Sequence, residues 1–269
     1  KPDQIAIIWD GPNGSAKRKK MDKNYKDGRK PLKLNRAFHN LTDQEVGENK
    51  TWQQARIMEY LNQMPVIQLI ADYTEADDII AHVINNPRYE GWKKTIISSD
   101  KDFFQLCRPD VQIYRPIQKK IVTHETIIEE FKIHPNNFAL ARAIAGDASD
   151  NLPGVKGAGL KTIAKRFSFL GREDEYEVSD IMRECLVVPK KLKIHENVKS
   201  SEDLIKSNYQ IMQLYHPNIR PLNRELINNA VRDFEPYFDK IKFTQMLFAD
   251  DAGHLNFSDL LQVFKKIKR

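Results

Sequence analysis

Cysteine, paired histidines and long apolar runs are scarce or absent in this chain of 269 residues. Its two cysteines, Cys107 and Cys185, offer neither a disulfide framework nor zinc-ligand spacing, which fits a reducing cytoplasm. No apolar run approaches the roughly 20 residues that span a bilayer. The histidines show no paired spacing, and no motif supports Ser-His-Asp or Cys-His catalysis. These absences argue against a disulfide scaffold, a membrane protein and zinc or triad chemistry.

Charge of both signs is abundant instead. Lys and Arg number 43 against 37 Asp and Glu, which gives a net charge of +6 and a pI near 9.1. This excess favours an anionic partner, although it is a weak signal by itself. With 41% apolar residues, the chain can bury a core, as one large domain or two small ones.

Four short apolar runs separated by helical patterns predict an α/β fold with a parallel sheet. The runs are 5–9, 66–70, 95–99 and 111–114, and each has the length of a buried strand. Helical patterns follow at 51–64, 76–85, 134–145 and 162–169. We expect an α/β domain over 1–135, with a basic arch at 17–50, and a mostly helical region over 136–269.

Acidic residues follow these strands or begin the next helices. The eight carboxylates are those of Asp10, Glu75, Asp77, Asp78, Asp100, Asp102, Asp147 and Asp150. Ligands bind beyond the carboxyl ends of strands in open parallel sheets, so we expect these acids to converge in one cleft. Converging carboxylates repel one another unless cations lie among them, and such an oxygen-rich site suits Mg²⁺. Two ions about 4 Å apart would clamp the attacking and leaving oxygens of a phosphodiester, as in a metal-dependent nuclease.

Each acidic cluster also has an ordinary explanation. Acids at 75–78 are favoured by the helix dipole, and a turn after a strand accepts Asp100 readily. Asp147 and Asp150 share one face of a turn, a spacing that suits metal ligation and simple exposure equally well. The combination of clusters, rather than any one of them, favours the metal site.

Two segments carry residues that suit a nucleic-acid backbone. Segment 17–36 holds ten Lys or Arg against two acids, with Tyr25 among them. It is either a solvated loop or an arm that grips phosphates and stacks Tyr25 on a base. Because it has little apolar surface to bury, we expect it to be poorly ordered without DNA. Segment 154–162 is a glycine hairpin that opens a helix, either a tight turn or a phosphate-binding loop, and nearby lysines favour the second reading.

Several of these motifs resemble those of the 5′-nuclease family. The run Gly-Asp-Ala-Ser-Asp-Asn-Leu-Pro-Gly-Val-Lys-Gly-Ala-Gly-Leu-Lys-Thr at 146–162 resembles its helix–three-turn–helix signature. Segments 75–78 and 99–103 resemble further motifs in the same order, and 25–29 resembles the Tyr-Lys-x-x-Arg of its arch. The resemblance covers about residues 5–170 and is closest to the T-even bacteriophage ribonuclease H type.

The resemblance implies a PIN-like parallel-sheet core with a helical C-terminal region. It implies Mg²⁺-dependent hydrolysis of DNA or RNA/DNA at 5′ ends or flaps, as in primer removal, with Mn²⁺ as an alternative ion. Asp10, Glu75 and Asp77 would surround one ion and Asp102, Asp147 and Asp150 a second, with Asp100 between them and Asp78 acting through water. Lys26 and Arg29 would contact the scissile phosphate. The implied DNA contacts are Tyr25, Lys26, Arg29, Gly154, Lys156, Gly157, Gly159, Lys161, Thr162 and Lys165, with K⁺ at the hairpin.

One departure from the family pattern concerns the sheet. The family has an earlier strand ending in Asp that has no counterpart here, so we expect a fragment, because losing a central strand would expose two unpaired edges. The alternative is a non-catalytic protein that binds flaps or junctions with an incomplete metal site. The expected partners are single-stranded-DNA-binding or clamp proteins of replication, and no contact with a membrane is expected. We expect a monomer in the cytoplasm of a bacterium or of a phage-infected bacterial host.

Overall fold

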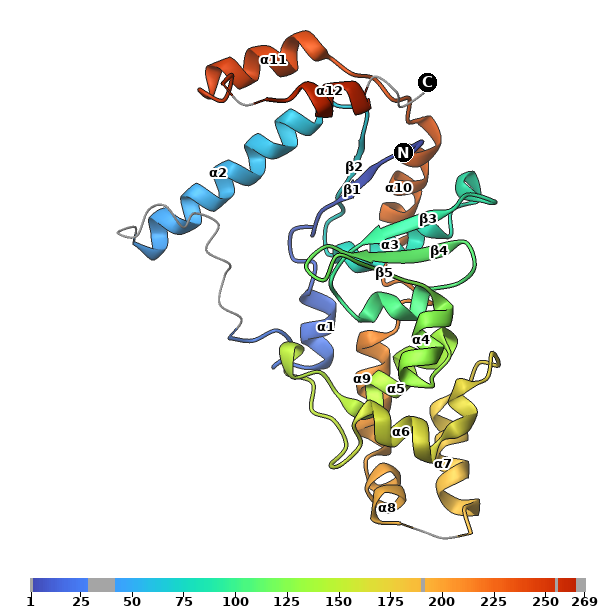
Figure 1. The fold of residues 1–269 in the computed structure, drawn as a ribbon. Helices are drawn as coiled ribbons and strands as arrows, with labels where there is room; N and C mark the ends of the chain where they lie inside the picture. The colour runs from blue at the N-terminus through green and yellow to red at the C-terminus, as the bar shows by residue number, and fades with distance from the viewer. Residues whose placement is uncertain (1, 29–41, 190–191, 255, 265–269) are drawn as a thin grey trace. The chain divides into compact units, whose positions relative to one another are not determined.

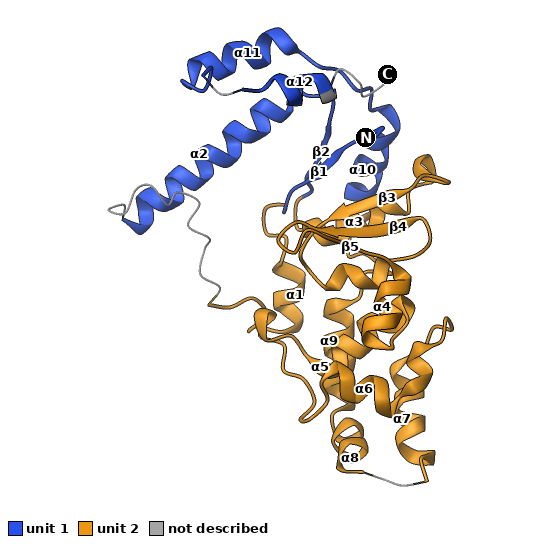
Figure 2. Ribbon diagram, in the orientation of Figure 1, with its two compact units in different colours: residues 1–10, 29–71, 222–269 blue, residues 11–28, 72–221 orange. Residues whose placement is uncertain are grey.

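The computed structural model describes residues 2–28, 42–189, 192–254 and 256–264. The chain divides into two compact units, which Figures 1 and 2 show as ribbons. Unit 1 comprises 1–10, 29–71 and 222–269, and unit 2 comprises 11–28 and 72–221. Segment 29–41 of the predicted arch, with Arg29, lies outside the described residues. Among the helices that are described, none is long and apolar enough to cross a membrane.

Unit 1 contains a two-stranded parallel sheet and several helices. Its elements are β1 Ala6–Ile8, α2 Asp43–Leu61, β2 Ile67–Leu69, α10 Pro221–Asp233 (whose first residue belongs to unit 2), α11 Lys240–Ala249 and α12 Ser258–Phe264. Ala6 lies opposite Ile67 in the β1–β2 pair. Helix α2 begins earlier than predicted because Thr42 and Glu45 form a capping box that satisfies two backbone N–H groups.

Unit 2 contains a mixed sheet surrounded by helices. Its strands are β3 Lys94–Ile97, β4 Val111–Arg115 and β5 Lys120–Val122. Its helices are α1 Ala16–Met21, α3 Ala76–Ile84, α4 His124–Phe131, α5 Phe138–Ala145, α6 Leu160–Arg166, α7 Val178–Val187, α8 Lys193–Ser200 and α9 Glu202–Met212, and its short 3₁₀ helices are η1 Pro87–Tyr89, η2 Asp102–Leu106, η3 Pro135–Asn137, η4 Ala148–Asp150 and η5 Ser168–Gly171. Strands β3 and β4 are parallel, and β5 returns antiparallel to β4.

The predicted α/β fold with parallel strands is confirmed, but two details of the sheet are wrong. Among the described residues the strands form two separate sheets, and the antiparallel strand β5 was not predicted. The strands are also less buried than their apolar runs suggest, since Ala6 of β1 is exposed and Ile97 of β3 is 71% exposed. The reason is that β1 pairs only with β2, and β3 only with β4, in the parts of the chain that the structure describes.

The core of unit 2 is built around α5. Six of its eight residues are buried, and it packs against α6 and α9. The rings of Phe104, Phe131 and Phe138 lie with centroids 5.3 to 5.9 Å apart. The buried Asn208 of α9 donates from Nδ2 to the carbonyl oxygens of Ala143 and Pro153 at 3.0 and 2.9 Å. This core draws on both sides of residue 135, where the predicted domain boundary stays a prediction.

Candidate metal centre

Acidic side chains from three connections of unit 2 gather in one place. Glu75 and Asp77 lie at the start of α3, Asp100 and Asp102 follow β3, and Asp147 and Asp150 follow α5. One small pocket is lined by Asp77, Asp102 and Asp150 together with Arg18 and Tyr25. Asp102, Asp147 and Asp150 each offer a carboxylate oxygen within 4.8 Å of the others. The structure therefore brings together acids that are up to 75 positions apart in sequence, from Glu75 to Asp150.

The proximity of these acids is visible in their pKa values. Burial raises the pKa of Asp77 to about 7, and the charge of Asp100 adds to the rise. Burial raises the pKa of Asp102 to about 6, with Arg142 opposing the rise and Asp100 adding to it. Asp100 thus acts on both groups of acids. Its Oδ1 accepts a hydrogen bond from the Asp102 backbone N–H at 2.9 Å, which fixes its place beside η2.

Arg142 joins Asp102 and Asp147 through hydrogen bonds to both carboxylates. Its Nη2 donates to Asp147 Oδ2 at 2.5 Å and to Asp102 Oδ1 at 3.0 Å. Burial works to raise the pKa of Asp147, but hydrogen bonds from Ser149 and the Arg142 charge bring it below its usual value. Sequence reasoning missed Arg142, although it is the only charged residue of the apolar helix α5, and that was an available signal.

A buried ion-pair network anchors α1 beside these acids. Arg18 is only 6% exposed. It donates to Glu75 and, at 2.8 and 3.3 Å, to the two oxygens of Asp78. Asp78 Oδ1 also accepts from the Asn218 backbone N–H at 2.8 Å. Protein groups thus engage both oxygens of Asp78, which anchors α1, and its predicted contact with a metal through water stays a prediction.

The turn after α1 reaches the same carboxylate. Lys26 Nζ donates to Glu75 Oε1 at 2.8 Å, and Tyr25 Oη donates to Glu75 Oε2 at 3.2 Å. Burial tends to raise the pKa of Glu75, but the Arg18 and Lys26 charges bring it below its usual value. Tyr25 is 3% exposed and belongs to the core in this structure, and its predicted stacking on a base of bound DNA stays a prediction.

The prediction that the basic segment 17–36 is poorly ordered is wrong for its described part, residues 17–28. Residues 16–21 form α1, and 22–28 form an ordered series of turns. The sequence argument treated the segment as exposed, whereas Arg18 is buried in pairs with Glu75 and Asp78 and Tyr25 belongs to the core. Residues 29–36 lie outside the described part of the chain.

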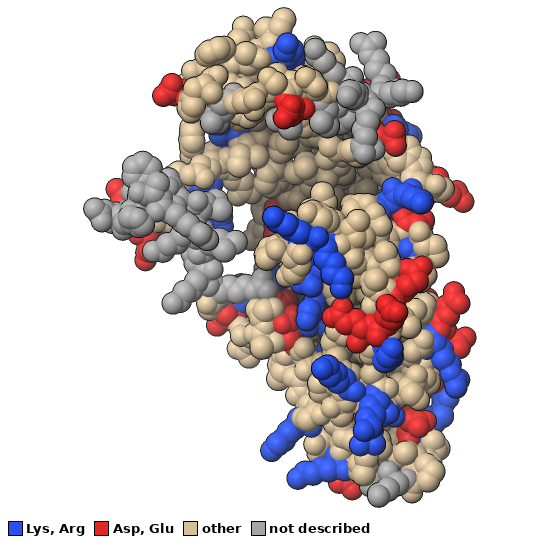
Figure 3. Space-filling model, viewed as in Figure 1, with Lys and Arg blue, Asp and Glu red and all other residues tan. Residues whose placement is uncertain are grey.

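The glycine hairpin is packed onto α5 through its backbone. A Cβ atom added to Gly154 would lie 1.9 Å from the Ala145 carbonyl oxygen, so only glycine fits there. Val155 N–H donates to the Ile144 carbonyl at 2.8 Å. The remaining predicted contacts of the hairpin are wholly or partly exposed: Lys156, Gly157, Gly159, Lys161, Thr162 and Lys165. In Figure 3, Lys and Arg side chains gather over the lower part of unit 2, where Figure 1 places α6.

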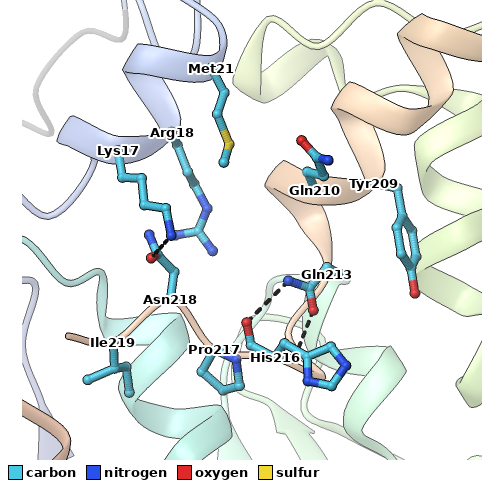
Figure 4. A pocket seen from close by; sticks show the side chains of 10 residues that line it. All are labelled: Lys17, Arg18, Met21, Tyr209, Gln210, Gln213, His216, Pro217, Asn218 and Ile219. Atoms are coloured by element: carbon cyan, nitrogen blue, oxygen red, sulfur yellow. Dashed lines mark hydrogen bonds between the residues drawn. The ribbon is translucent and has the colours of Figure 1, made fainter. Parts of the chain in front are cut away.

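A larger cavity of about 370 Å³ lies between α1 and the end of α9, and Arg18 is among the residues that line it. Figure 4 shows Met21 pointing into it from α1, and Lys17 joined to Asn218 by a hydrogen bond. Gln213 is bound to the backbone of His216 on the opposite side. No carboxylate is among the described residues that line this cavity. It is therefore chemically distinct from the acidic centre.

Asp10 lies two residues after the end of β1 and is the last residue of the first segment of unit 1. Its place among the metal ligands stays a prediction, as does the role of every site residue that the sequence singled out.

The first 132 residues match the family model described as the N-terminal resolvase-like domain of 5′-3′ exonucleases. This match places residues 1–132 in the 5′-3′ exonuclease family. A flap endonuclease Xni of Shewanella piezotolerans is 32% identical over 161 residues, which are 60% of this chain and 57% of that protein. A 5′-3′ exonuclease of Aquifex aeolicus is 26% identical over 246 residues, which are 90% of this chain and 74% of that protein.

Other members of the 5′-3′ exonuclease family are much longer than the matched region. The thermostable DNA polymerase I of Thermus aquaticus is 30% identical over 163 residues, and the match covers 61% of this chain but only 18% of the polymerase. The fold is also that of a solved structure, the T5 D15 protein co-crystallised with metal ions. That structure has a TM-score of 0.63 and 21% identity, and the match covers 91% of this chain and 85% of that one.

The acidic centre predicts a pH-dependent stability for the metal-free protein. Asp77 and Asp102 have pKa values of about 7 and about 6 in the folded state, against about 3.9 for aspartate in an unfolded chain. Between these values the folded protein holds more protons than the unfolded chain, so the free energy of unfolding should fall as pH rises from about 4 to about 7. We expect a decrease on the order of 2 kcal/mol, less than the full shifts imply because both side chains keep some contact with solvent.

Urea unfolding in EDTA at a series of pH values measures this decrease. Asp77→Asn is the matched variant, because it keeps the shape of the side chain and cannot titrate. Its stability should fall less steeply with pH than that of the unmodified protein. Equal slopes for the two proteins would show that Asp77 titrates normally.

Proposed function

We propose that this chain carries the catalytic centre of a Mg²⁺-dependent, structure-specific 5′-nuclease acting on 5′ ends or flaps of DNA or RNA/DNA. The observation that supports this most is the gathering of Asp102, Asp147 and Asp150, with oxygens within 4.8 Å of one another. Asp100 lies close enough to raise the pKa of both Asp77 and Asp102. A donor set made only of carboxylate oxygens fits Mg²⁺, and Mn²⁺ accepts the same ligands.

The carboxylates divide into two sets in this proposal. Asp102, Asp147 and Asp150 would hold one ion, and Asp10, Glu75 and Asp77 a second, with Asp100 between the sets. When bound, Mg²⁺ supplies an activated water and stabilises negative charge on the phosphate. Arg142 keeps Asp102 and Asp147 aligned through its hydrogen bonds to both. The net reaction adds one water across a P–O bond and leaves a phosphate end and a hydroxyl end.

Lys26 is the residue of unit 2 best placed to bind the scissile phosphate. Its ammonium group lies 2.8 Å from Glu75 Oε1, at the edge of the acidic group. An ammonium in this position would donate to a phosphate oxygen as negative charge builds up during hydrolysis. Arg29, outside the described residues, would act beside it.

The exposed lysines of the hairpin and α6 would hold the duplex backbone. Replacing Lys161 and Lys165 by Glu should weaken binding to all sequences alike, because phosphate contacts do not read bases. The plot of log affinity against log salt concentration should become shallower by about 2 units. Fluorescence anisotropy of a labelled flap in Ca²⁺ measures both effects. Replacing Lys119 and Lys120, exposed at the end of the β4–β5 turn and the start of β5, by Glu changes net charge equally and should leave the slope unchanged.

The DNA polymerase I relatives support a place in replication. Single-stranded-DNA-binding or clamp proteins are the partners that we propose there. Hydrolysis would take place in the cytoplasm of a bacterium or of a phage-infected bacterial host. K⁺ at the glycine hairpin, beside the duplex backbone, completes the proposed set of ions.

The decisive experiment uses the chain as it stands. A 5′-labelled flap duplex and a blunt duplex of the same sequence are incubated with the protein in Mg²⁺, and again in EDTA. We expect cleavage of the flap in Mg²⁺ alone. Binding of the flap without cleavage would overturn the catalytic proposal in favour of a non-catalytic flap-binding protein. Equal cleavage in EDTA would show that the acidic group does not act through a metal.

A further inference from the structure

The turn that carries Lys26 is held by the turn that carries two of the candidate metal ligands. Asn151, directly after η4, donates from Nδ2 to the carbonyl oxygens of Asn24 and Asp27 at 3.1 and 2.7 Å. The Lys26 backbone N–H donates to the Asp150 carbonyl at 3.1 Å. Three hydrogen bonds therefore join segments that are more than 120 residues apart in sequence, two of them from the one carboxamide of Asn151.

The backbone of Lys26 needs such support. Its φ of 55° is in the left-handed region, which is strained for a residue with a long side chain. Asn151 is left-handed as well, with a φ of 58°, but asparagine tolerates this conformation well. The two carbonyls that Asn151 binds flank Lys26 in the chain, so its carboxamide spans the strained residue. This arrangement fixes the direction in which the Lys26 side chain leaves the turn, toward Glu75.

We infer that Asn151 is a positioning residue that sets Lys26 in register with the acidic centre. The inference rests on the proposed function, because it assigns Lys26 the task of binding the scissile phosphate. Asn151 itself need not touch the substrate. It acts through the turn at 24–27, and the same 147–151 turn supplies Asp147 and Asp150, so the phosphate donor and the candidate metal ligands share one support.

Two variants remove the amide donor in different ways. Asn151→Gly keeps the left-handed backbone without strain, and Asn151→Asp keeps the size of the side chain but places an oxygen against two carbonyls. Asn136→Asp is the matched control, because Asn136 likewise donates from Nδ2 to a backbone carbonyl, that of Glu173 at 2.8 Å, in another part of unit 2. Each protein is compared in single-turnover cleavage of the flap, in flap binding in Ca²⁺, and in amide hydrogen exchange.

We expect both Asn151 variants to cleave about tenfold more slowly, because misplacing a catalytic group by a small distance lowers the rate without loss of binding. Flap affinity in Ca²⁺ and cleavage by the Asn136 variant should stay within twofold of the unmodified protein. In a Lys26→Ala background, Asn151→Gly should cause no additional loss, since a residue that acts through Lys26 has nothing left to position. A further tenfold loss in that background would overturn the inference.

Hydrogen exchange tests the same inference without cleavage. The amides of Lys26 and Asp27 should exchange at least about tenfold faster in both Asn151 variants, because the turn loses two of its restraints. Unchanged exchange at these amides would overturn the inference even if cleavage slowed. If the unmodified protein failed to cleave any flap, the proposed function would fall, while the exchange measurement would still decide whether Asn151 holds the Lys26 turn.

Discussion

Replacing Asp100 by Ala should lower single-turnover cleavage of a 5′ flap in Mg²⁺ by at least about 10³-fold and leave flap affinity in Ca²⁺ nearly unchanged. The charge of Asp100 raises the pKa of both Asp77 and Asp102, so its carboxylate serves both groups of acids. Affinity should persist because the exposed lysines of the hairpin and α6, rather than the acids, would contact the backbone.

The control for Asp100 is Asp203→Ala, which removes one exposed carboxylate near the start of α9. That variant should cleave at the unmodified rate. Isothermal titration with Mn²⁺ adds a readout that does not depend on cleavage, and the Asp100 variant should bind the metal more weakly. An Asp100 variant that kept most of its cleavage rate would contradict the assignment of this carboxylate to the reaction.

Replacing Arg18 by Met should lower the free energy of unfolding in EDTA by about 3–5 kcal/mol, because it leaves the buried carboxylate of Asp78 without its cation and that of Glu75 with Lys26 alone. Arg18 pairs with Glu75 and Asp78, which are 4% and 1% exposed. Burial lowers the pKa of Arg18, and the charges of Asp78 and Glu75 more than offset this, so the arginine stays charged. Its loss therefore removes a full positive charge from the interior of unit 2.

The origin of this loss can be separated from packing. In the triple variant Arg18→Met, Glu75→Gln, Asp78→Asn both buried carboxylates become neutral amides and only the partly exposed Lys26 loses an acidic partner, so most of the lost stability should return. Lys19→Met, at an exposed position of the same helix, should change stability by less than about 0.5 kcal/mol. Urea denaturation measures all three variants. If the triple variant were as unstable as Arg18→Met, shape rather than charge would explain the effect.

Local patterns predicted the elements and the acids well. The apolar runs before Asp10 and Asp100 are strands, and the acids at 75–78 begin a helix as expected. These features depend on residues within a few positions of one another. The antiparallel strand β5 escaped prediction because its three residues, Lys-Ile-Val, are too few to show an alternating pattern.

Contacts between distant residues explain the misses in the site. Nothing in a run of ten cations distinguishes Arg18, whose partners lie 57 and 60 positions away. The burial of Tyr25 depends on the same network, since its hydroxyl donates to Glu75. Arg142 was within reach of sequence reasoning, because an arginine on an otherwise apolar helix requires an acidic partner when it is buried. Spacing alone could predict which acids meet, but not which cations meet them.

The contact between Gly154 and the end of α5 has a consequence for where a strand would be cut. Backbone lies directly on backbone there, with no side chain between that could bend or change rotamer. The same few residues lead from α5 through Asp147 and Asp150 to the hairpin. If the hairpin holds the duplex and cleavage takes place at the acidic centre, a fixed length of polypeptide separates the binding site from the cleavage site. The distance from the junction to the cleaved bond would then be constant, because the stiff chain between the hairpin and the acids sets it.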